Sequence, residues 1–322
     1  MSSTAGTLSY QDYKDNIAKT MLSDQVRMVN MTSTAFRATA RLEPKFGAHK
    51  GQTVAIEKWQ KLTQNTSTIN EYAELPLKKP TINEVTITMN EYGNGVAYTE
   101  KAKTVAEYMI DSEIRRLIEV NSTESMDSVV GAVAQTSDVF YTPTGTTTSG
   151  GTFDKDGTIT ETATRDLRAF DFLTIAANLR SDNIPKYDGQ YYLAVCNPFA
   201  MKALFAPDAN EPTVSSNIEI LKWADPQANL KGEIGMGYGF RFVEETNVLS
   251  SGIGGTTYNG ECIILGDDAI AEAMALPETV DTEEHNFGRF LAIAWRTLTG
   301  FSKVWTNSTD GQYAIVRIHD AT

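Results

Sequence analysis

The residues best suited to chemistry are scattered along the chain and form none of the common catalytic motifs. His49, His285 and His319 lie far apart in the sequence, and none of them belongs to an H-E-x-x-H zinc motif. The chain also lacks the G-K-[ST] of phosphate loops and the G-x-S-x-G and S-x-x-K motifs of serine nucleophiles. The sequence therefore predicts no catalytic residue, no metal site and no cofactor, and we expect that the chain is not an enzyme.

Three glycines at alternate positions, Gly235, Gly237 and Gly239, suggest a phosphate-binding loop at first sight. The dinucleotide fingerprint, however, needs G-x-G-x-x-G between a strand and a helix. Here the glycines precede a strand-like stretch that ends at Glu244. We therefore expect them to allow close packing of the backbone and not to bind a nucleotide.

Two groups of carboxylates in the last third of the chain have structural explanations. Asp267 and Asp268 follow a strand-like stretch, and such a pair is typical of a helix start, so we expect a short helix over 268–275. The run from Glu278 to Glu284 lacks the alternating oxygen ligands and the glycine of a calcium loop. We expect this run to form a solvated loop.

The two cysteines are each embedded in apolar, strand-like sequence. Cys196 ends the stretch YYLAVC, and Cys262 lies within ECIIL. Two isolated cysteines do not form the disulfide framework of a small secreted domain. We therefore expect buried free thiols in a reducing compartment.

Composition indicates a globular protein of one elaborate domain or two ordinary ones. The 322 residues are 41% apolar and 21% charged. The net charge of −13 argues against tight wrapping of nucleic acid, which needs concentrated lysine and arginine. No apolar run approaches the ~20 residues that cross a bilayer, and the amino terminus lacks the features of a signal peptide. We expect a soluble protein that is made inside a cell and contacts no membrane.

A long polar excursion, from Lys50 to Tyr98, is the most informative part of the sequence. Thr53–Trp59 and Val85–Asn90 have the composition of strands, and the second alternates apolar with polar residues. The residues between them are rich in Thr, Asn, Lys and Glu and show no clear period. A hairpin of this length has too little apolar surface to fold on itself, so we expect it to rest on another molecule. This favours assembly over catalysis.

Several side chains of the excursion are candidates for contacts between subunits. Lysines lie there together with glutamates, which favours charge pairing with an acidic neighbour, although solubility alone would also explain them. The candidate contact residues are Lys58, Lys61, Lys78, Lys79, Glu71, Glu74, Trp59 and Tyr72.

Helical periodicity follows the excursion over an unusual length. From about Glu100 to Ser137 there is no proline, and apolar residues recur every three to five positions. Thr104 and Glu107 match a capping box. If continuous, this helix would have ~35 residues and a length of ~50 Å. We expect a spine that lies across a sheet, because the apolar stripe does not keep the strict heptads of a coiled coil.

The other expected elements alternate between helices and strands. An amphipathic helix from Ser9 belongs either to an N-terminal arm or to an ordinary core. The Thr- and Gly-rich segment 140–164 is expected to be a surface insertion with a hairpin around 155–157. Helices are expected at 166–180, 198–205 and 211–221, and strands at 190–196, 240–244, 261–265, 290–295 and 313–318.

This order of elements is similar to that of tailed-phage major capsid proteins with the Hong Kong ninety-seven fold. The best local matches, Tyr191–Pro198 (YYLAVCNP) and Gly235–Glu244 (GMGYGFRFVE), are similar to the family typified by the N-four-like podophages. Asn197 stands where that family often has histidine. The resemblance implies an α+β fold with an N-terminal arm (1–49), an extended hairpin loop (50–98), a peripheral domain with the spine helix (99–187), an axial domain (188–277), and an acidic loop with the closing strands of the peripheral domain (278–322).

The function that the resemblance implies is a shell protein. Such a chain self-assembles into hexamers and pentamers of an icosahedral phage head that encloses double-stranded DNA, contacted nonspecifically. Scaffold, portal and decoration proteins are its implied partners, and the virion, made in the bacterial cytoplasm, is its location. The alternative is an encapsulin-like nanocompartment shell of the same fold. An enzyme with an unfamiliar site, and a phage tail or decoration protein, fit the sequence less well.

Overall fold

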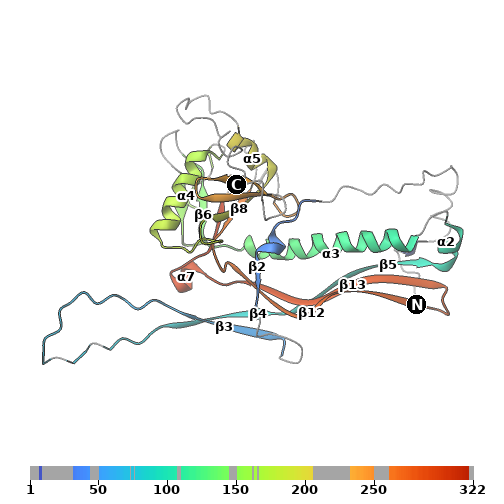
Figure 1. Cartoon of the computed structure of the whole chain (residues 1–322), viewed down its shortest axis with the longest axis horizontal. Helices are drawn as coiled ribbons and strands as arrows, with labels where there is room; N and C mark the ends of the chain where they lie inside the picture. The colour runs from blue at the N-terminus through green and yellow to red at the C-terminus, as the bar shows by residue number, and fades with distance from the viewer. Residues whose placement is uncertain are drawn as a thin grey trace.

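The computed structural model describes residues 7–8, 32–43, 51–144, 151–205, 233–249 and 261–318, except for residues 73, 76, 107–109, 162 and 165–166. Its described strands form three sheets of five, seven and two strands (Figure 1). The five-stranded sheet lies under a long helix, and the seven-stranded sheet forms a separate core with shorter helices around it (Figure 1). The expected α+β class is confirmed.

The five-stranded sheet has the order β1-β5-β13-β12-β2 and is built mainly from three long strands. Ile114, Ile118 and Met126 of the helix α3 pack on this sheet because they share one helical face. Trp295 lies beneath them and donates its ring N–H to Asn121 at 3.0 Å. The strands are β1 (Thr7–Leu8), β5 (Asn90–Thr99), β13 (Phe290–Lys303), β12 (Ile270–His285) and β2 (Ala40–Leu42), the last of which follows the short 3-10 helix η1 (Phe36–Thr39).

The spine consists of two helices and not of the single long helix that the sequence predicts. α2 spans Glu100–Val105 and ends where Ala106 turns extended (φ −65°, ψ 138°). α3 then covers 25 residues, Ile110–Ala134, a length of about 37 Å. Thr99 caps α2 by accepting the N–H of Ala102. Thr104, expected as the cap, instead donates its hydroxyl to the carbonyl of Glu100.

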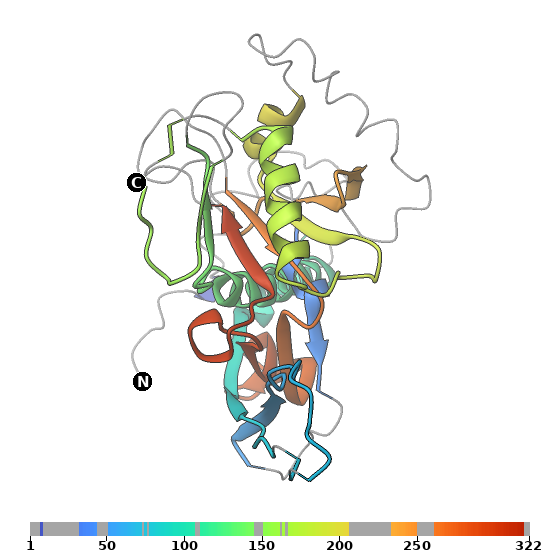
Figure 2. The same ribbon diagram turned by 90° about the vertical axis from the view of Figure 1, so that its left-hand side faces the viewer.

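The seven-stranded sheet has the order β7-β6-β14-β11-β8-β10-β9. Figure 2 shows α4 (Ala169–Ser181) standing beside its strands. Phe172 of α4 meets Phe240 and Phe242 edge-on, with ring centroids 5.5 and 5.1 Å apart. The remaining elements are β8 (Tyr192–Cys196), α5 (Pro198–Phe205), β9 (Glu233–Gly237), β10 (Phe240–Glu244), β11 (Cys262–Leu265) and β14 (Ile315–Ile318).

The glycine-rich stretch forms β9 and the turn of the hairpin between β9 and β10, whereas the sequence predicted only a strand after the glycines. Tyr238 and Gly239 make its two-residue turn with φ of 55° and 93°. Turns in which both central residues have positive φ suit the twist of paired strands, and glycine adopts that conformation without cost.

Two predictions about segment 140–164 and the chain end are corrected. β6 (Phe140–Thr142) is fully buried and pairs with β7 (Thr152–Asp154), so the hairpin lies earlier than 155–157 and belongs to the core sheet. β14 pairs with β6 and β11, whereas β13 lies in the five-stranded sheet. The closing strands therefore belong to two different sheets.

The expected helix over 268–275 and the expected loop over 278–284 are both wrong. Asp268 lies in a turn with φ 52°, and β12 then runs from Ile270 to His285. β12 pairs with β13 along this whole length and with β2 over Ile270–Glu272. Pairing on two sides overrides the helical propensity of the sequence AIAEAMAL. The acidic run is the exposed outer part of this strand.

The expectation that the two cysteines are free thiols is also wrong. Cys196 in β8 and Cys262 in β11 lie directly opposite each other in neighbouring antiparallel strands, and they form a disulfide. The 66 positions that separate them in the sequence give no local sign that they meet.

Three expectations rest partly or wholly outside the described residues. These are the amphipathic helix from Ser9, the helix at 211–221, and most of the N-terminal arm. Among the described residues, none of the helices is long and apolar enough to span a bilayer. The domain boundaries stay a prediction.

Candidate intersubunit hairpin

The polar excursion forms a separate two-stranded sheet that projects from the body of the subunit (Figure 1). β3 spans Thr53–Trp59, the range that the sequence predicts, and β4 spans Ile82–Thr88. They pair from Thr53 opposite Thr88 to Trp59 opposite Ile82. Beyond Trp59 the described residues form an extended loop, and Figure 2 looks along the hairpin from this end.

One face of the hairpin packs on the body at its base. Val54, Ile56 and Ile87 face a small core formed with β12, β13 and Val304. Gly300 of β13 lies under this crossing, where an added Cβ would stand 2.3 Å from the carbonyl oxygen of Thr88. A glycine is required there because the backbones of β13 and β4 approach so closely.

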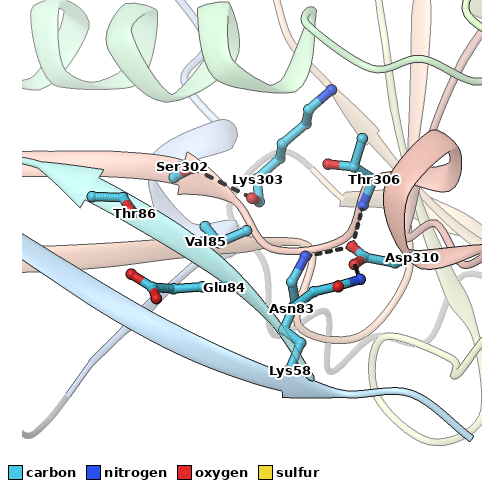
Figure 3. Close-up of a pocket in the computed structure, with 9 residues that line it drawn as sticks. All are labelled: Lys58, Asn83, Glu84, Val85, Thr86, Ser302, Lys303, Thr306 and Asp310. Carbon is cyan, nitrogen blue, oxygen red and sulfur yellow. Dashed lines mark hydrogen bonds and ion pairs between the residues drawn. The ribbon is translucent and has the colours of Figure 1, made fainter. Parts of the chain in front are cut away.

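A buried ion pair fixes the base of the hairpin to the end of the chain (Figure 3). Lys58 of β3 bonds to Asp310, the last residue of the short helix α7 (Asn307–Asp310), and also donates to the carbonyl of Val304 at 2.8 Å. The side chains of Lys58 and Asp310 are only 4% and 1% exposed. The ammonium group also lies 5.6 Å from the centre of the Trp305 ring.

The Asp310 carboxylate is fully surrounded by donors. Besides Lys58, it accepts the Asn83 side-chain amide at 2.8 Å and the backbone N–H of Thr306 at 3.0 Å. Burial alone would raise the pKa of Asp310, but the hydrogen bonds from these donors outweigh it, so the pKa lies below its usual value. Asp310 is therefore ionised at neutral pH, and the cluster joins β3, β4 and α7.

Beside this anchor, a cleft of about 290 Å³ lies between β4 and β13 (Figure 3). Its lining is mostly polar and is formed by residues 83–86 of β4 on one side and by Ser302 and Lys303 on the other. Among the described residues, no group of three or more His, Cys, Asp or Glu side chains is arranged to hold a metal ion.

The outer face of the hairpin points away from the body. Glu57 and Glu84 lie opposite each other on this face, and like charges in register weaken a strand pair. Trp59 and Ile82 form the next pair and are both exposed. These features agree with the view that the hairpin does not stabilise itself.

The structure separates the eight candidate contact residues into two groups. Lys58 points inward and is bonded within its own subunit, so its role here is to anchor the hairpin. The other seven are exposed on the hairpin, where Lys78 donates across the loop to the carbonyl of Thr63 at 3.1 Å. Their contacts with another subunit stay a prediction.

Sequence reasoning concentrated on charge and missed most of the exposed apolar side chains of the hairpin. The signal was present, because Leu62, Ile69 and Leu77 interrupt a polar stretch without any strand or helix period. The exposed large apolar side chains of the hairpin are Trp59, Leu62, Ile69, Tyr72, Leu75, Leu77 and Ile82.

Comparison with known proteins gives a clear result only at the level of structure. No protein-family model matches the sequence, and no curated protein matches it. A chain from the capsid of Ralstonia phage GP4 is similar with a TM-score of 0.67 and 13% identity, over 100% of this chain and 99% of that one. A chain from the capsid of cyanophage Pam1 has a TM-score of 0.66 and 12% identity, over 95% and 98% of the two chains. A chain from the capsid of cyanophage P-SCSP1u has a TM-score of 0.64 and 12% identity, over 96% and 94%.

The chain therefore has the fold of tailed-phage capsid proteins, and this fold extends over its whole length. The expected Hong Kong ninety-seven type architecture is confirmed. The narrower resemblance to N-four-like podophage capsids stays a prediction.

Proposed function

We propose that this chain is a major capsid protein that self-assembles into the hexamers and pentamers of an icosahedral phage head. The observation that supports this most directly is the projecting hairpin. It is anchored at its base by Lys58 and Asp310, yet its far part packs on nothing in the described subunit. The capsid fold gives this hairpin a neighbour to rest on. Contacts between different patches of identical copies generate rings and closed shells.

Electron microscopy of the purified chain tests this proposal. We expect closed shells or hexameric rings, and a persistent monomer would contradict the function. A deletion of residues 60–77 removes most of the loop and leaves the anchor at Lys58, Asn83 and Asp310 intact. This variant should keep the circular dichroism of the parent and fail to assemble. Normal shells from it would show that the hairpin is dispensable.

The proposed head would enclose double-stranded DNA without binding it tightly. A net charge of −13 disfavours a close contact with phosphates, because each such contact needs a cation. Weak, nonspecific contact and repulsion from the wall suit a container whose contents must leave. Scaffold, portal and decoration proteins are the further partners that this function implies, with synthesis in the bacterial cytoplasm and a final location in the virion.

The domain assignment follows the same proposal. The five-stranded sheet with α3 would be the peripheral domain and the seven-stranded sheet the axial domain, with β14 as the strand that returns to the latter. A nanocompartment shell is the alternative use of this fold. It is not favoured, because the similar structures named above are all chains of phage capsids. The same neighbours are structural proteins, which agrees with a role other than catalysis.

A further inference from the structure

Three segments that are distant in sequence meet where α3 passes from one sheet to the other. Ile118 of α3 packs on the five-stranded sheet, whereas Val130 packs with strands of the seven-stranded sheet. Between these two contacts, residues 32–37 and residues 245–249, which follow β10, both bond to the helix. Figure 1 shows this place at the end of α3, beside the blue segment that leads into β2. We call residues 32–37, 124–131 and 245–249 the junction.

Residues 32–37 are held by hydrogen bonds from both sides. Thr32 donates its backbone N–H and its hydroxyl to the Glu124 carboxylate of α3, at 3.0 and 2.8 Å. Ser33 donates its N–H to the Thr246 hydroxyl at 2.8 Å, and its carbonyl accepts the Thr246 N–H at 3.2 Å. The segment is therefore clamped between the helix and the loop that follows β10.

Two fully buried carboxylates, Asp127 and Glu245, lie at the centre of the junction. Asp127 of α3 accepts the backbone N–H of Arg37 at 2.9 Å. Glu245 accepts the backbone N–H groups of Val248 and Leu249 at 2.7 and 2.9 Å. Each carboxylate thus fixes the backbone of one segment of the junction.

Asn247 links the two carboxylates. Its backbone N–H donates to Glu245, and its side-chain amide lies 3.3 Å from the carboxylate of Asp127. The same amide donates to the Glu124 carbonyl at 2.8 Å and to the Ser128 hydroxyl at 3.0 Å. The two acidic side chains therefore belong to one buried hydrogen-bond network.

Within the described residues, no cation bonds to either carboxylate. The other charged residues of the surrounding segments are Arg37, Glu124 and Glu244. The guanidinium of Arg37 turns away and donates to Glu272 at 2.6 Å. β8, whose Cys196 carbonyl accepts the Glu245 N–H, carries no charged residue. Burial raises the pKa of both carboxyls against the effect of their hydrogen bonds, and the charge of Asp127 raises the pKa of Glu245 further.

We infer that a proton controls the junction, which is closed while the Asp127–Glu245 pair holds one and opens when both carboxylates are ionised. A proton on the pair removes one buried charge and the repulsion between the two, and oxygen atoms remain to accept the backbone N–H groups. When that proton passes to solvent, release of residues 32–37 from α3 lets water reach Asp127. This control is a property of the folded subunit and does not depend on the proposed assembly.

The direction of the pH effect follows from the raised pKa values of the two carboxyls. A group whose pKa is higher in the closed junction than in the open one stabilises the closed junction below its open-state pKa. That contribution is lost as the pH rises through the closed-state pKa. The junction is therefore tighter at pH 5 than at pH 8.

Hydrogen exchange of the unassembled full-length subunit, read by mass spectrometry, tests this control. Protection factors divide out the intrinsic dependence of exchange on pH. Between pH 5 and pH 8 we expect the protection of residues 34–40 to fall by about tenfold or more. Residues 112–120 of α3 lie outside the junction, so their protection should stay within about threefold.

Variants separate the loss of a proton from a merely structural role. Asp127→Asn with Glu245→Gln keeps an oxygen acceptor at each position and cannot ionise, so its protection over residues 34–40 should stay within about threefold from pH 5 to pH 8. Glu119→Gln, at an exposed position of the same helix, is the matched control and should show the fall of the parent. If the double variant does not fold, Asp127→Asn alone should show a smaller fall than the parent, because Glu245 has lost its charged neighbour.

Three results would overturn the inference. One is a protection of residues 34–40 in the parent that does not fall between pH 5 and pH 8. Another is the same fall in the parent and in the variants that cannot ionise at Asp127. The third is an equal fall over residues 112–120, because the whole subunit and not the junction would then respond to pH. None of these results depends on whether the chain forms shells, so the proposed function is tested separately.

Discussion

The anchor of the hairpin gives the sharpest prediction about stability, and Lys58→Met is the change that probes it. Methionine fills most of the space of the lysine stem but removes the ammonium group. Asp310, whose side chain is 1% exposed, would keep its bonds from Thr306 and Asn83 and lose its counter-ion. The carbonyl of Val304 would lose its bond as well.

The expected loss in the free energy of unfolding is about 3–4 kcal/mol at pH 7. A hydrogen bond to a charged group contributes about 1.5–3 kcal/mol, and removal of one partner from a buried ion pair costs about 3–5 kcal/mol. The folded-state pKa of Asp310 is lowered, so the contribution of the pair is present above the unfolded pKa of about 3.9 and is lost as the pH falls through the folded value. A measurement at pH 7 therefore records the full effect.

Urea unfolding of the unassembled subunit, followed by circular dichroism, measures this loss. Lys61→Met, at an exposed position of the same hairpin, is the control and should change stability by less than about 0.5 kcal/mol. The double variant Lys58→Met with Asp310→Asn should recover more than half of the loss, because no uncompensated charge stays buried. A loss below about 1 kcal/mol, or a double variant no more stable than the single one, would refute this account.

Three further predictions concern the core. Burial raises the pKa of Asp127, although the hydrogen bond from the Arg37 N–H acts in the opposite direction. The stability that this group contributes is therefore present below the unfolded pKa of about 3.9 and is lost as the pH rises through the folded pKa. Asp127→Asn should therefore gain stability relative to the parent between pH 4 and pH 7, and a difference independent of pH in urea unfolding would contradict this. Reduction of the Cys196–Cys262 disulfide opens a loop of 66 positions and should lower the free energy of unfolding by about 4 kcal/mol in the chain-entropy model. Urea unfolding with and without a phosphine reductant measures this loss. Gly300→Ala should cost about 1–3 kcal/mol, because its Cβ would meet the Thr88 carbonyl at 2.3 Å, and a neutral result in thermal unfolding would show that β4 moves freely away from β13.

Local sequence signals were sufficient to predict a helix or strand where the segment has one clear period and few competing partners. The strand Thr53–Trp59 and the helix from Pro198 have the ranges or starts that their sequences predict. The hairpin could also be expected to lie apart from the body, because its composition excludes a core of its own. The resemblance of the whole order of elements supplied the fold, which no single motif specifies.

Other features depend on contacts that are distant in sequence. β12 contains the helix-favouring residues AIAEAMAL, and only its pairing with β13 and β2 makes it a strand. The inward direction of Lys58 depends on Asp310, which lies 252 positions away. A lysine between Glu57 and Trp59 has the sequence context of a surface residue. Its burial follows from the position of α7, which the sequence does not specify locally.

The hairpin crosses the body without sharing a sheet with it, and this bears on how the proposed shell can curve. β3 and β4 pair only with each other, so apolar side chains hold them on β12 and β13, and one ion pair holds them to α7. Tilting the hairpin therefore breaks no ladder of backbone hydrogen bonds, whereas bending a strand within the five-stranded sheet would break several. A small change of angle at Lys58 and Gly300 is amplified along the hairpin to its tip. In the proposed shell, one sequence can thus meet the steeper angle between neighbours around a five-fold axis and the flatter angle around a six-fold axis.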